Sequence, residues 1–137
     1  MYINVIGPQG RPLTINPVHV NYIHMTPEKL SLGLYGKPTH GMFLKDPTTI
    51  TTFVNQILAN SYFLDLRTNN DGTILNMASI KEVDYVEGQN IYVYFSLESK
   101  INIAWQFKTQ IETALANFVY SIGGGGTGAR WMRRRRI

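Results

Sequence analysis

The last eight residues of the chain carry the side chains best suited to chemistry with an anion. Arg130 and the run Arg133–Arg136 place five guanidinium groups close together, and Trp131 lies among them. Neighbouring arginines repel one another, and contact with phosphates relieves that repulsion while counterions leave the nucleic acid. An indole ring can in addition stack on a base or enter an apolar pocket. The sequence therefore predicts a phosphate-binding segment whose contacts are Arg130, Trp131, Arg133, Arg134, Arg135 and Arg136.

Two other interpretations of this segment stay open. It could bind the acidic surface of a protein partner, or it could be a tail that only keeps the chain in solution. Glycines at Gly123–Gly126 and Gly128 precede it, and this composition predicts a flexible linker. Fully extended, residues 123–137 could reach about 50 Å from the preceding helix.

A second candidate site is the strand predicted at Ile91–Phe95. Tyr92 and Tyr94 alternate with apolar residues, so strand geometry places both rings on the face opposite the core. Asn102 and Gln106 are predicted on a comparable face of the next strand. Two phenol rings edged by amides could stack unpaired bases. Ordinary strand aromatics covered by a partner or a helix are the other interpretation, and it is favoured because no cation is interleaved with the tyrosines.

No group of residues predicts catalysis, a cofactor or a metal. The chain has no cysteine, and the spacing of His19 and His24 puts them on opposite sides of a regular strand. The glycine run lacks the Lys-Ser/Thr end of a phosphate loop and follows a helix rather than a strand. No Gly-x-Ser-x-Gly elbow occurs. We therefore expect a non-catalytic protein that needs no cofactor.

The positive charge of the chain belongs to its end. The formal net charge is +4, but without the five terminal arginines eight basic residues face nine acidic ones, which leaves −1. No apolar run is long enough to span a bilayer. The first residues lack the basic start and long apolar stretch of a signal peptide. We expect no membrane contact, and a location in the cytoplasm or inside a virus particle rather than secretion.

The elements that must position these residues follow one order twice. The second copy, Gly72–Ile122, holds a strand bent near Ala78, two further strands, and a helix that begins at Lys108. The first copy, Gly10–Ala59, shows the same order about sixty residues earlier. Its helix, predicted from Thr48 to Asn60, starts where Asp46 can cap the free amides and Pro47 suits the first turn.

An internal repeat explains this order better than chance matching of apolar residues. It predicts an α+β fold in which two tandem ββββα units share one core, with antiparallel sheets and one helix each. The predicted division is a first unit at 1–61, a second unit at 62–122, and a Gly-rich linker with an Arg-rich tail at 123–137.

The order of four strands and a helix, taken twice, resembles the tandem ββββα units of the Whirly and PUR-α class. In that class two such units form one curved-sheet body that binds single-stranded nucleic acid, so the resemblance implies a nucleic-acid partner. The openings Ile15–Val20 and Leu75–Ile80 also look like small bacterial and phage β-rich modules of the FlbD type.

We therefore predict a nucleic-acid-associated protein whose tail binds phosphates, with Tyr92 and Tyr94 as secondary contacts. The sequence does not choose among single-stranded DNA, duplex DNA and RNA. The alternative is a structural component of a large assembly such as a phage virion, in which the tail clips a neighbouring subunit. We expect a homo-oligomer or a larger assembly.

Overall fold

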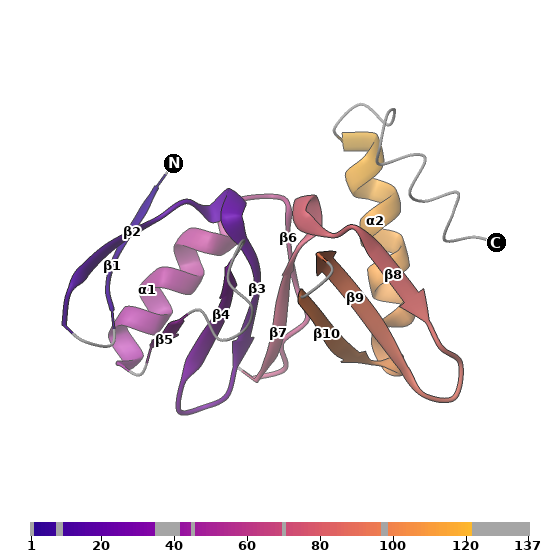
Figure 1. The fold of residues 1–137 in the computed structure, drawn as a ribbon, viewed down its shortest axis with the longest axis horizontal. Coiled ribbons are helices and arrows are strands. Elements are labelled where there is room, and N and C mark those ends of the chain that lie inside the picture. The colour runs from indigo at the N-terminus through magenta and orange to yellow at the C-terminus, as the bar shows by residue number, and fades with distance from the viewer. Residues whose placement is uncertain are drawn as a thin grey trace. The chain divides into compact units, whose positions relative to one another are not determined.

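The computed structural model describes residues 2–7, 10–34, 42–44, 46–69, 71–96 and 99–121. They form β-strands, short 3₁₀ helices (η1 to η3) and two α-helices (Figure 1). In chain order the elements are β1 (Ile3–Ile6), β2 (Pro12–Ile15), η1 (Pro17–His19), β3 (Val20–Met25), β4 (Leu30–Leu34), β5 (Met42–Leu44), α1 (Pro47–Leu58), β6 (Phe63–Asp65), β7 (Gly72–Asn76), η2 (Met77–Ser79), β8 (Glu82–Tyr85), β9 (Asn90–Ser96), β10 (Ser99–Ala104), η3 (Trp105–Phe107) and α2 (Lys108–Ser121).

The chain divides into two compact units, Met1–Ser79 and Ile80–Ile137. We call them unit 1 and unit 2. Unit 1 contains a two-stranded sheet, β1-β2, and a five-stranded sheet of order β5-β4-β3-β7-β6. Unit 2 contains a three-stranded sheet of order β10-β9-β8. Every strand pair that the structure describes is antiparallel, so the prediction of an α+β fold with antiparallel sheets and two helices is confirmed.

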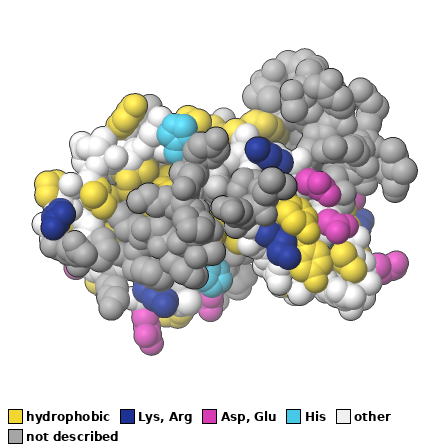
Figure 2. All heavy atoms as spheres, in the orientation of Figure 1, with side chains coloured by type: hydrophobic (Ala, Val, Ile, Leu, Met, Phe, Trp, Pro, Cys, Tyr) yellow, Lys and Arg dark blue, Asp and Glu magenta, His cyan; other side chains and the backbone are white. Residues whose placement is uncertain are grey.

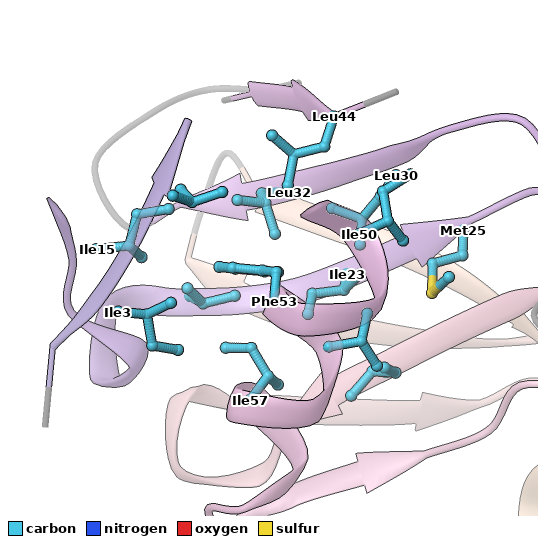
Figure 3. Close-up of a cluster of buried hydrophobic side chains, with 14 of the residues drawn as sticks. Ile3, Ile15, Ile23, Met25, Leu30, Leu32, Leu44, Ile50, Phe53 and Ile57 are labelled. Atoms are coloured by element: carbon cyan, nitrogen blue, oxygen red, sulfur yellow. The ribbon is translucent and has the colours of Figure 1, made fainter. Parts of the chain in front are cut away.

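Helix α1 supplies the centre of the unit 1 core. Asp46 accepts a hydrogen bond from the amide of Thr49 at 2.9 Å and so caps the helix, as the sequence predicts. The apolar stripe of the helix is buried, and Phe53 points into a cluster that also contains Ile3, Ile23 and Leu32 (Figure 3). This cluster draws on the hairpin β1-β2, on the five-stranded sheet and on α1, which is why all three stay together.

Two asparagines turn a strand into a 3₁₀ helix at equivalent places in the sequence. The Asn16 side chain accepts a hydrogen bond from the amide of Val18 at 3.2 Å. The Asn76 side chain accepts one from the amide of Ala78 at 2.9 Å. The bend predicted near Ala78 is therefore confirmed, and a side chain that competes with the strand ladder causes it.

Asn76 also ties this bend to the rest of unit 1. Its side chain is fully buried, and the amide Nδ2 donates to the carbonyl of Val20 at 2.9 Å and to that of Val18 at 3.3 Å. The carbonyl of Pro17 lies 3.5 Å away. Junctions η1 and η2 are thus held together by one amide group.

The order of elements repeats, but the strand pairing does not. The series β2-η1-β3-β4-β5-α1 has the same order as β7-η2-β8-β9-β10-α2. However, β3 pairs with both β4 and β7, whereas in the described chain β8 pairs with β9 alone. The buried cluster around α1 contains residues from Ile3 to Ile74 only. Tandem ββββα units that share one core are therefore not confirmed, and the repeat boundary near residue 61 stays a prediction.

Unit 2 is a sheet with one covered face. Helix α2 lies over one side of the β8-β9-β10 sheet (Figure 1). The buried hydrophobic residues are those that alternation assigns to this side, together with two from the helix: Val83, Ile91, Val93, Phe95, Ile103, Ile111 and Leu115. The opposite side of the sheet, called the outer face below, presents the alternate residues. Among the described residues, no helix is long and apolar enough to cross a membrane.

Candidate functional site

The predicted phosphate-binding segment lies outside the described part of the chain. The structure therefore does not place Arg130, Trp131, Arg133, Arg134, Arg135 or Arg136. Of the predicted contacts it places Tyr92 and Tyr94, and these lie in unit 2.

Tyr92 and Tyr94 form a short aromatic ridge on the outer face. Both are partly exposed, and they alternate along β9 with the buried residues Ile91 and Val93. This confirms the face assigned to them from the sequence. The Tyr92 hydroxyl donates to the side-chain oxygen of Gln89 at 3.4 Å, which ties the ridge to the β8-β9 turn.

A lysine lies over both rings, which the sequence analysis missed. Lys100 on β10 is opposite Tyr94 in the register, and its Nζ lies 5.3 Å from the Tyr92 ring centroid and 5.8 Å from that of Tyr94. Ammonium groups at such distances are attracted by the negative face of a phenol ring. No cation is interleaved with the tyrosines along β9, but Lys100 reaches both rings from the neighbouring strand, where it is distant in sequence. Alternation puts Lys100 on the same face of β10 as Asn102, but only the register of β9 with β10 puts it opposite Tyr94.

Two carboxylates flank the ridge on its other side. Glu82 and Asp84 on β8 are opposite Tyr94 and Tyr92, respectively. Residues that face each other across an antiparallel pair share a face of the sheet. The outer face therefore runs from an acidic edge on β8, over the tyrosines, to Lys100 on β10. In the space-filling view, hydrophobic side chains of unit 2 lie between dark-blue and magenta ones (Figure 2).

Of the two side-chain amides predicted beside the tyrosines, the structure places one on the outer face and the other in a 3₁₀ helix. Asn102 is exposed and opposite Tyr92, so its predicted place is confirmed. Gln106 is not on the strand, because β10 ends at Ala104 and Trp105–Phe107 form η3. The prediction for Gln106 was wrong, since alternation cannot show where a strand turns into a helix.

A second lysine also lies between aromatic rings in unit 2. The Nζ of Lys108, at the start of α2, is 5.5 Å from the Tyr85 ring centroid and 5.9 Å from that of Trp105. It also forms an ion pair with Glu112 at 3.1 Å, one helical turn further on. This cluster fastens the start of α2 to the end of β8, which is a structural role.

A hollow of about 220 Å³ opens in unit 1 beside α1. Arg67 is at its wall, but its guanidinium group is held by Asp65 through Nε at 2.9 Å and Nη2 at 2.8 Å. This pairing lowers the pKa of the Asp65 carboxyl below its ordinary value and raises the pKa of Arg67. Because the charges of this pair compensate each other, the hollow offers no clear charge to a ligand.

Histidines and acids give no metal site in the described residues. No three His, Cys, Asp or Glu side chains there lie close enough to hold an ion. His19 and His24 are exposed on separate elements.

Comparison with known proteins identifies a fold. No protein-family model and no curated protein sequence matches the chain. A solved structure does match: the LytTr DNA-binding domain of a Bacillus cereus protein described as a methyl-accepting/DNA response regulator. The TM-score is 0.59 with 10% sequence identity, over 83% of this chain and 95% of that domain. At this identity the likeness concerns the fold alone.

The resemblance to the Whirly and PUR-α class was wrong, and so was the likeness to small phage β-rich modules. The matching structure is a LytTr domain, a different β-rich fold. The physical reason is the strand pairing: sheets of two, five and three strands replace two equivalent curved sheets. Apolar alternation reveals which residues face inward, but it does not reveal which strands are neighbours.

Proposed function

We propose that this chain is a non-catalytic nucleic-acid-binding protein and that its terminal arginines contact the phosphates. The observation that carries the proposal is the fold. It is similar to that of a solved domain described as DNA-binding, and the match covers 95% of that domain. The distribution of charge supports it, because five arginines gather in the last eight residues. Such a cluster is the electrostatic pattern of a phosphate contact.

The proposal assigns most of the affinity to the tail. The rest of the chain has eight basic and nine acidic residues, so it offers a polyanion no net attraction. On the outer face of unit 2, two carboxylates accompany one lysine. If most of the terminal arginines contact phosphate, log K against log salt should fall with a slope of roughly −3 to −4.5.

The test is a fluorescence-anisotropy titration of the full chain with labelled oligonucleotides of one sequence, as single-stranded DNA, duplex DNA and RNA. In one variant, Arg133–Arg136 become glutamine. In the matched control, the same residues become lysine, which keeps the charge but removes the bidentate fork. We expect the glutamine variant to lose most of the affinity and the lysine control to keep the salt slope. Unchanged affinity in the glutamine variant would contradict the proposal.

Light scattering on the same samples tests the alternative of a structural assembly component. A multimer that ignores all three oligonucleotides would favour that alternative. A species that binds an oligonucleotide through its tail favours the proposal, whatever its oligomeric state. The prediction that Tyr92 and Tyr94 contact bases stays a prediction, and Lys100 would have to leave their rings before a base could stack there.

A further inference from the structure

We draw no further inference here: the strongest candidate, the apolar groove of about 280 Å³ that Ile6 and Pro12 of the β1-β2 hairpin form with Thr48, Thr52 and Phe53 of α1, carries nothing, because nothing in the described part of the chain shows what covers it.

Discussion

Replacing Asn76 with alanine should destabilise unit 1 much more than replacing Asn16 with alanine. Both asparagines end a strand and accept a hydrogen bond from the amide two residues later. They differ in burial: the Asn76 side chain is 0% exposed, whereas Asn16 is partly exposed and water can replace its bond.

The magnitude follows from the partners of each side chain. Alanine at position 76 removes two Nδ2 donors that serve the carbonyls of Val20 and Val18, and one acceptor that serves Ala78. A buried group left without a partner costs about 1–3 kcal/mol, and the three losses overlap. We expect the free energy of unfolding to fall by about 3 kcal/mol for Asn76→Ala. Loss of the exposed cap in Asn16→Ala should cost about 1 kcal/mol or less.

Urea unfolding followed by far-ultraviolet circular dichroism measures both values. The slope of the unfolding free energy against urea concentration should be compared between wild type and variants, because an unchanged slope means that only the stability has changed. Asn76→Asp provides a second measurement, because it keeps the shape but points a carboxylate at carbonyl oxygens. It should be at least as destabilising as alanine at neutral pH. Its stability should recover as the pH falls, since the protonated carboxyl can donate again. Equal losses at Asn16 and Asn76 would refute the reasoning.

Three further predictions concern single side chains of unit 1. A Cβ at Gly33 would collide with the ring of Tyr22, so Gly33→Ala should cost about 1–3 kcal/mol in urea unfolding, and less in a Tyr22→Leu background. Arg67 lowers the pKa of Asp65, whose ordinary value is 3.8, so this pair stabilises the fold above that pH. At neutral pH, Asp65→Asn should lower the free energy of unfolding by about 1 kcal/mol, a small value because the carboxylate is 34% exposed and solvent screens the pair. This difference from wild type should shrink as the pH falls below 3.8. Asp46→Ala should lower the unfolding midpoint and Asp46→Asn should not, because asparagine keeps an acceptor for the start of α1.

Features that depend on neighbouring residues could be predicted from the sequence. The start of α1 follows from Asp46 and Pro47, and the helix ends at Leu58, within two residues of the predicted Asn60. The bend at Ala78 follows from a polar side chain at the end of a strand. The face of Tyr92 and Tyr94 follows from alternation in β9. In each case the residues that decide the structure lie within a few positions of one another.

Features that depend on strand pairing could not be predicted. The sheet of unit 1 joins Ile23 of β3 to Ile74 of β7, and nothing in either strand identifies the other. Lys100 reaches the tyrosines because a register shift between Ser99 and Lys100 sets the pairing of β9 with β10. The acidic edge likewise depends on the pairing of β8 with β9. The chemical character of the outer face is therefore a consequence of register.

The proposal that the terminal arginines bind phosphate is tested most directly by affinity for one oligonucleotide at two salt concentrations. Between about 50 and 200 mM salt, the full chain should lose roughly a hundredfold in affinity. With Arg133–Arg136 changed to glutamine, binding should be weak and its loss over the same range only about fourfold. The same affinity and the same salt dependence in both proteins would contradict the account.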